Sequence, residues 1–316
     1  MLRIALVNCG CVGQSYADVL PFVPQADIVA VVDTDSLAAQ QTADCCGTDW
    51  TADHVDQLLN AGARDCDAVI IHGPIQEEHL HQMANANKHV LVDLESLAAT
   101  DLDSLARAFD ASSGNLHIGQ PLRFQPSNQI IKDRLDAQKL GSPGLLRLHR
   151  WENSGFGLVT IESLIREIDL AHWVFGSKPN TLYAIRHGGD QQYIQLHLGF
   201  PQGGMAVIDG ATSLPEGAQP YHSTTVIGST GAAYADEHRN TQLLIGAEQT
   251  SALLTGEGTQ ALRNQLACFV DACQPSGAPA MTVNDAQQAQ LVMQAAATSL
   301  ESGQSVRVTG DTYEIV

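Results

Sequence analysis

Short apolar runs alternate with longer amphipathic stretches through the first third of the chain. Aliphatic and β-branched runs bounded by turn residues predict buried strands, and the stretches between them have helix-compatible spacing. This repeated order of strand and helix predicts a parallel, doubly wound sheet over residues 1–120. The strands are expected at 3–7, 27–33, 67–73, 88–93 and 115–120, with helices over 14–23, 55–59 and 101–112 among those between them.

The pattern changes near residue 145 to consecutive strand-like runs separated by turns. Such an order is typical of a mostly antiparallel, open sheet with one covered face. We therefore expect an α/β protein of two domains, a dinucleotide-binding domain over 1–120 and a substrate or oligomerisation domain over 121–316. The later strands are expected at 145–151, 180–188, 192–200, 204–212 and 221–229, with helices over 160–176, 258–274 and 285–300.

The acidic composition narrows the range of partners. Asp and Glu number 35 against 16 Lys and Arg, a formal net charge of -19, which repels nucleic acid and anionic membranes. No apolar run approaches the length of a membrane span, and residues 4–7 are too few for an export signal. The seven cysteines lack a CxxC pair, which predicts neither disulfides nor a metal site and suits a cytoplasmic protein.

A degenerate glycine turn follows the first predicted strand. Gly10 would let the backbone approach a pyrophosphate, and Gly13 would let the following helix pack closely. Asn8 takes the place of the first glycine, and asparagine tolerates the positive φ of such a turn. Asp33 ends the second strand, where its carboxylate would accept hydrogen bonds from ribose hydroxyls. Because no basic residue follows it closely, NAD is expected as the cofactor, with NADP less favoured.

Several motifs in order resemble the glucose-fructose oxidoreductase and inositol dehydrogenase (Gfo/Idh/MocA) family. They are the glycine turn with Asp33, KHVLV at 88–92, GQPLRFQP at 119–126, IDLAHWVFG at 168–176 and VIGSTGAA at 226–233. The resemblance implies an NAD(P)-binding N-terminal domain, a C-terminal sheet used for oligomer contacts, and hydride transfer to or from a sugar or polyol. It places these residues at the cofactor: Asn8, Gly10, Cys11, Val12, Asp33, His72, Gly73, Pro74 and Arg123. Arg123 has an interdomain salt bridge as its alternative role.

The chain departs from that family where protons are handled. The family's lysine after KHVLV is missing, and Asp93 and Glu95 stand in that segment. The family's histidine three residues before Asp169 is replaced by Arg166. We expect Asp93 or Glu95 to act as acid and base, and Arg166 to steady an alkoxide or bind a substrate carboxylate. Glu162 and Arg166 also have the spacing of an ordinary surface ion pair.

Two further interpretations stay open from the sequence. The proton could be handled by His149 or His172 instead, although a lone histidine is more often structural. Alternatively, loss of both usual groups leaves a catalytically altered NAD-binding sensor or partner-binding protein. The function expected first is an NAD-dependent oxidoreductase, in a homo-oligomer, that acts on a small sugar, polyol or acidic hydroxylated substrate.

Overall fold

The structure is a computed structural model of the 316-residue chain. It divides the chain into two compact units, Met1–Phe124 with Glu257–Ala286, and Gln125–Gly256 with Gln287–Val316. Each unit is considered by itself below. The residues described are 1–8, 10, 13–60, 65–153, 155, 157–187, 192–218, 220–236, 241–245, 250–253, 259–274 and 277–316.

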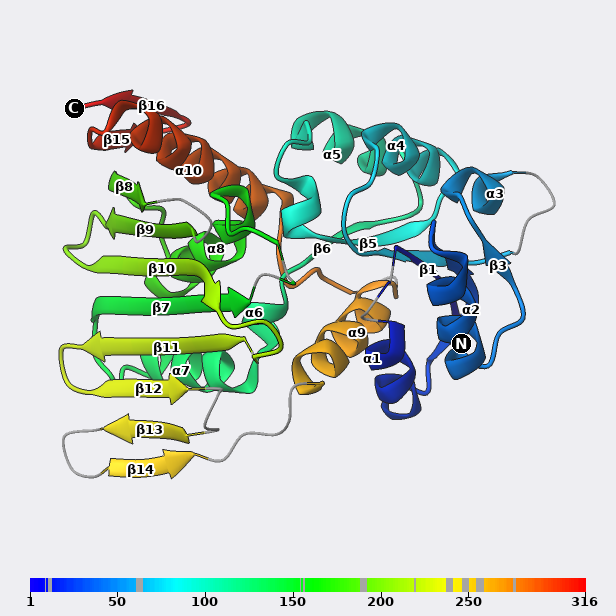
Figure 1. The fold of residues 1–316 in the computed structure, drawn as a ribbon, viewed down its shortest axis with the longest axis horizontal. Helices are drawn as coiled ribbons and strands as arrows, with labels where there is room; N and C mark the ends of the chain where they lie inside the picture. The colour runs from blue at the N-terminus through cyan, green and yellow to red at the C-terminus, as the bar shows by residue number, and fades with distance from the viewer. Residues whose placement is uncertain are drawn as a thin grey trace. The chain divides into compact units, whose positions relative to one another are not determined.

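The first unit contains a parallel sheet with helices on its faces (Figure 1). Its described residues form six strands in the order β3-β2-β1-β4-β5-β6, as the alternating pattern predicts. The central strands are aliphatic runs buried on both faces, which is why they show no polar alternation. The elements are β1 (Leu2–Val7), α1 (Gly13–Val19), η2 (Leu20–Phe22), β2 (Ala26–Val32), α2 (Ser36–Cys46), β3 (Thr51–Ala52), α3 (Val55–Leu59), β4 (Ala68–Ile71), α4 (Glu77–Asn85), β5 (His89–Asp93), η3 (Leu94–Leu97), α5 (Leu102–Asp110), β6 (Leu116–Gly119), α6 (Pro121–Phe124) and α9 (Gln260–Ala272).

Strand register brings the carboxyl ends of the central strands to one edge of this sheet. Ile71 of β4 pairs with Val7 of β1 and with Val92 of β5. The residues that follow these pairs, among them His72 and Asp93, therefore meet at that edge. In open parallel sheets this edge is where ligands bind.

Helix α9 reaches the first unit from far along the sequence. Its Leu266, Phe269 and Val270 are buried in the same core cluster as Ile4 and Leu91, together with other residues of β1 and α1. The Phe269 ring lies edge-on to the His117 ring of β6, with centroids 5.1 Å apart. Burial lowers the pKa of His117 to about 4, so this ring is neutral at neutral pH. The helix thus completes the hydrophobic core of the first unit.

The second unit is built on a wide, mostly antiparallel sheet. Its described strands number ten, in the order β14-β13-β12-β11-β7-β10-β9-β8-β15-β16; β7 pairs parallel with β10 and antiparallel with β11. The expected fold class is confirmed. The elements are α7 (Pro126–Asp136), β7 (Pro143–Asn153), η5 (Glu162–Leu164), α8 (Ile165–Phe175), β8 (Thr181–His187), β9 (Gln192–Gly199), β10 (Met205–Leu214), β11 (Tyr221–Gly228), β12 (Ala232–Asp236), β13 (Thr241–Ile245), β14 (Thr250–Leu253), α10 (Val283–Ser302, beginning in the first unit), β15 (Val306–Thr309) and β16 (Thr312–Ile315).

Residues of β7 alternate between the two faces of the second sheet. Leu146, Leu148 and Arg150 are buried, whereas Arg147 and Trp151 are exposed. The buried face is the one that α8 covers.

The 20-residue α10 is the longest helix described. Neither it nor any other described helix is long and apolar enough to span a bilayer.

Replacement of Gly13 tests the packing of α1 on α2. A Cβ at this position would lie 2.1 Å from Thr42 Oγ1 and 2.7 Å from Thr42 Cγ2. We expect Gly13→Ala to lower the free energy of unfolding by about 1–3 kcal/mol through overpacking, measured by chemical denaturation. Ser15→Ala, on the same helix, should change it far less.

A double variant separates this contact from a change in helix propensity. Thr42→Ala removes the two atoms that the new Cβ would meet first, so the loss in G13A/T42A should be smaller than the sum of the two single losses. Additive losses would contradict the packing explanation.

Candidate functional site

Two described residues of the turn after β1 have a left-handed backbone conformation. Asn8 has a φ of 53° and Gly10 a φ of 37°, both in the left-handed region that asparagine and glycine tolerate. The Asn8 side chain donates from Nδ2 to the carbonyl of Pro74 at 2.8 Å, which ties this turn to the loop after β4. A Cβ at Gly10 would meet nothing within 4 Å, so a ligand can approach its backbone. The predicted contacts Cys11 and Val12 lie outside the described residues.

Asp33 is held beside this turn by two backbone hydrogen bonds. Its carboxylate accepts the Gly10 N–H at 2.9 Å through Oδ2 and the Asp35 N–H at 2.9 Å through Oδ1. The residue is 7% exposed. A carboxylate has about four acceptor positions, so these two bonds orient Asp33 and leave it able to accept ribose hydroxyls.

A cavity of 270 Å³ lies beside the turn within the first unit. Its lining residues include two carboxylates, Asp53 and Asp56, and no Arg or Lys. That lining suits an uncharged ribose and base and opposes a 2′-phosphate. The lining residues are Asn8, Val32, Thr34, Asp53, His54, Val55, Asp56, Pro74, Ile75, Gln76 and His79.

Asp93 is hydrogen-bonded to His72 at the carboxyl edge of the first sheet. His72 Nδ1 lies 2.6 Å from Asp93 Oδ2, and His72 Nε2 lies 2.6 Å from the Tyr16 hydroxyl. Tyr16 is fully buried on α1, while the side chains of His72 and Asp93 are 18% and 23% exposed. The contacts join α1, β4 and β5 in one hydrogen-bonded chain.

The chemistry of the three groups assigns the direction of these bonds. An ionised carboxylate only accepts, so His72 Nδ1–H donates to Asp93. In the neutral imidazole Nε2 then carries the lone pair and accepts the Tyr16 hydroxyl proton. The hydrogen bond from His72 therefore fixes the orientation of the Asp93 carboxylate. Sequence reasoning included His72 as a cofactor contact and missed Tyr16, which has no motif of its own.

The other oxygen of the Asp93 carboxylate lies against a glycine of the neighbouring strand. Gly119, paired with Asp93 in the sheet, would place a Cβ 3.0 Å from Asp93 Oδ1 and 3.5 Å from Gln265 Nε2. A side chain there would press on the carboxylate. Glu95, the alternative acid and base, lies two residues on in η3 and is partly buried.

Arg166 and Asp169 belong to α8 of the second unit. Asp169 is fully buried and Arg166 is partly buried. Glu162, which has the spacing of an ion-pair partner for Arg166, is exposed and lies in η5 before the helix. One turn beyond Asp169, the Trp173 ring lies beneath the Lys132 ammonium, 5.9 Å from the ring centre.

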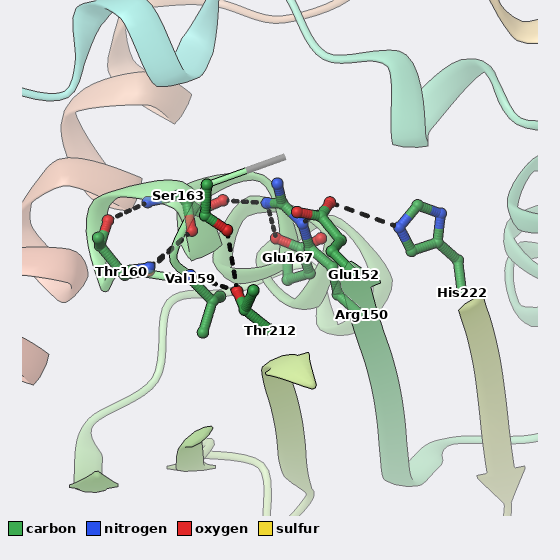
Figure 2. A network of polar contacts seen from close by, with 9 residues as sticks. Arg150, Glu152, Val159, Thr160, Ser163, Glu167, Thr212 and His222 are labelled. Atoms are coloured by element: carbon green, nitrogen blue, oxygen red, sulfur yellow. Dashed lines mark hydrogen bonds and ion pairs between the residues drawn. The ribbon is translucent and has the colours of Figure 1, made fainter. Parts of the chain in front are cut away.

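A buried ionic network fixes α8 to β7 (Figure 2). Arg150 donates from Nε to Glu152 at 2.9 Å, lies 3.7 Å from the Glu167 carboxylate, and donates from Nη1 to the Ser163 carbonyl. His222 lies 4.0 Å from Glu152. Removal of one partner from such a network leaves a buried charge uncompensated and is strongly destabilising. The network therefore sets the position of the helix that carries Arg166 and Asp169.

His149 lies on the opposite face of that sheet from α8. Its Nδ1 is 2.9 Å from Ser223 Oγ and its Nε2 is 3.3 Å from Asp209, and the hydrogen bond from His149 lowers the pKa of Asp209. His149 and Asp209 line an open 590 Å³ hollow with Trp151 and Tyr193. His172, by contrast, is buried on α8 rather than facing solvent.

The Arg123 guanidinium is buried within the first unit. Its Nη1 donates to the Ala280 carbonyl at 3.2 Å and lies 3.5 Å from Asp285. These contacts tie α6 to the segment that opens α10. Gly73, another predicted cofactor contact, has a φ of 66° after β4.

Comparison with known proteins supports the fold and the cofactor. Residues 2–109 match the model GFO_IDH_MocA, described as an oxidoreductase family with an NAD-binding Rossmann fold. The first third of the chain is therefore similar to the Gfo/Idh/MocA oxidoreductases, as the sequence motifs predict, and NAD is supported as the cofactor.

Curated and solved relatives match nearly the whole chain. "Uncharacterized oxidoreductase YrbE" of Bacillus subtilis is 24% identical over 330 residues, covering 96% of this chain and 95% of that protein. Myo-inositol 2-dehydrogenase of Thermotoga maritima is 22% identical, covering 97% and 98%. An oxidoreductase of Agrobacterium radiobacter, solved with NAD+, L-tartaric acid and magnesium, superposes with a TM-score of 0.83 at 17% identity, covering 97% and 98%.

Loss of the Tyr16 hydroxyl tests the chain of hydrogen bonds that joins Tyr16, His72 and Asp93. In Tyr16→Phe the acceptor on His72 loses its partner in a largely buried setting, so we expect a loss of about 1–3 kcal/mol in unfolding free energy, measured by denaturation. Tyr313→Phe, at a more exposed tyrosine, is the matched control. Equal stability of Y16F and Y313F would show that the Tyr16–His72 bond contributes nothing.

Proposed function

We propose that this protein transfers a hydride between NAD and a hydroxyl-bearing carbon of a sugar, a polyol or a small acidic hydroxylated compound. The observation that carries the proposal is the pairing, at one sheet edge, of an open glycine turn beside Asp33 with an Asp93 carboxylate oriented by His72. The substrate class is supported by relatives named as inositol dehydrogenases.

Bound NAD supplies the hydride acceptor, and the chain supplies its binding site. In this proposal the Asn8 and Gly10 turn receives the pyrophosphate, because its backbone is left-handed and open above Gly10. Asp33 accepts hydrogen bonds from the adenosine ribose, and Pro74 lines the neighbouring cavity. Predicted contacts by Cys11, Val12, His72, Gly73 and Arg123 remain part of the proposal.

Asp93 is proposed to take the proton of the substrate hydroxyl. Its Oδ2 is bonded to His72, so Oδ1, the oxygen that Gly119 approaches, receives the proton in oxidation and returns it in reduction. A positioned base of this kind contributes about 10²- to 10⁴-fold in rate. His72 is hydrogen-bonded to the carboxylate, and Tyr16 is hydrogen-bonded to His72. Together these two bonds fix the orientation of Oδ1.

Arg166 and Asp169, which belong to the second unit, are also proposed as functional groups. A guanidinium is permanently charged, so Arg166 suits either a developing alkoxide or a carboxylate of the substrate. Asp169, fully buried on the same helix, is proposed as its orienting neighbour. Glu95 is the second choice for the acid and base.

We also propose that the protein forms a cytoplasmic homo-oligomer through the open face of the C-terminal sheet. Trp151, Tyr193 and Ile185 expose 37%, 42% and 50% of their surfaces there, and apolar patches of this kind mark interaction sites. The five described cysteines are all free thiols, which supports a reducing compartment.

Titration with NADH and with NADPH, followed by nicotinamide fluorescence, tests the cofactor site. We expect NADH to bind at least about tenfold more tightly, because the 2′-phosphate of NADPH would meet the Asp33 carboxylate. Asp33→Ser should lower the ratio of the Kd for NADPH to the Kd for NADH. Binding of neither nucleotide would overturn the cofactor assignment.

Removal of the charge at position 93 tests the acid–base assignment. Asp93→Asn keeps the shape of the side chain, so NADH affinity should stay the same while kcat on a substrate found in a polyol and sugar-acid screen falls by about 10²-fold or more. Glu95→Gln is the matched comparison. A loss in E95Q without one in D93N would transfer the role to Glu95.

Two other results would contradict the proposed reaction. Unchanged turnover in both variants would remove both carboxylates from the mechanism. Tight NADH binding with no turnover across the screen would favour the alternative that the sequence leaves open, an NAD-binding sensor or partner-binding protein.

A further inference from the structure

Three potential metal ligands from distant parts of the chain meet inside the first unit. His89 begins β5, His117 lies in β6, and Cys273 follows the last residue of α9. One ring nitrogen of each histidine and the Cys273 Sγ all lie within 4.8 Å of one another. The three residues share no sequence motif.

The two imidazoles carry polar atoms that lack partners. His89 Nδ1 and His117 Nε2 are buried without a hydrogen-bond partner in the part of the chain that the structure describes. His117 as a whole is only 5% exposed. An unsatisfied buried polar group costs about 1–3 kcal/mol, and a metal ion bound by a ring lone pair would offset that cost.

We propose that His89, His117 and Cys273 bind a divalent cation of the zinc type. Two imidazoles and one thiolate form a borderline-soft ligand set, which favours Zn²⁺ over Mg²⁺ or Ca²⁺. Donor atoms around tetrahedral zinc lie about 3.3–3.6 Å apart, so small side-chain rotations close the site. The thiol proton passes to solvent as the Zn–S bond forms, and water takes the fourth position.

The cluster lies away from the proposed acid–base group. His89 opens β5 and Asp93 ends it, so the cluster lies about 13 Å along the strand from the proposed acid–base group. Cys273 is at the C-terminal end of α9, whereas His89 and His117 are on the sheet that α9 covers. The ion would therefore pin the end of this helix to β5 and β6.

Cobalt binding tests the site directly. Untagged full-length protein, freed of metal with a chelator, is titrated with Co²⁺ and then with Zn²⁺. We expect about one equivalent of Co²⁺ to bind, with thiolate-to-cobalt charge-transfer absorption and the intense visible bands of a tetrahedral site. Zn²⁺ should displace it and raise the Tm in a concentration-dependent way.

Two cysteine variants separate this site from adventitious binding. Cys273→Ser should abolish both the charge-transfer band and the Tm increase. Cys268→Ser should keep both, because Cys268 lies on the same helix, is also partly buried and is outside the cluster. Absence of the cobalt spectrum from the wild type, or its persistence in C273S, would overturn the proposal.

A third variant covers the case in which C273S fails to fold. His89 is only half-buried, and His89→Ala should lower cobalt affinity by at least about tenfold in a folded protein; unchanged affinity would overturn the proposal. NADH affinity, measured on the metal-free and Zn²⁺-loaded forms, should be the same. Failure of the metal site therefore leaves the proposed dehydrogenase function untouched, and failure of NADH binding leaves the metal site untouched.

Discussion

Parallel pairing of β4 with its neighbours is the constraint on which the candidate site depends. Ile71 lies between Val7 and Val92 in the sheet, so the residues that follow these strands are forced to one edge. Asn8, His72 and Asp93 meet there although they are distant in sequence. Strand pairing brings these residues together. Hydrogen bonds then orient their side chains, both among Tyr16, His72 and Asp93 and between Asn8 and Pro74.

Much of the fold and the nucleotide turn could be predicted because these features are local. Strands such as Ala68–Ile71 can be recognised as aliphatic runs. The positive φ angles of Asn8 and Gly10 are ones that asparagine and glycine tolerate. The sequence predicts that Gly13 allows close packing of its helix; the structure adds that the close neighbour is Thr42 of α2. Asp33 sits beside the turn because βαβ geometry brings the end of β2 there.

What the sequence could not reveal depends on contacts between side chains from separate elements. No periodicity relates Tyr16 to His72, so the orientation of Asp93 was invisible before the structure. The cysteines lack ligand spacing, and the sequence accordingly predicts no metal site; His89, His117 and Cys273 become neighbours only through tertiary packing. Arg150 likewise has two carboxylate neighbours, Glu152 and Glu167, of which one is seventeen residues away.

The late contribution of α9 has a consequence for biosynthesis. The core cluster around Ile4 and Leu91 contains Leu266 and Phe269 of α9. The N-terminal sheet therefore cannot bury the residues that α9 covers while the ribosome is still making the C-terminal sheet. Contacts of such long sequence separation slow folding, and the nascent N-terminal segment stays exposed to chaperones and to aggregation meanwhile. The domain that is translated first is thus among the last to be completed.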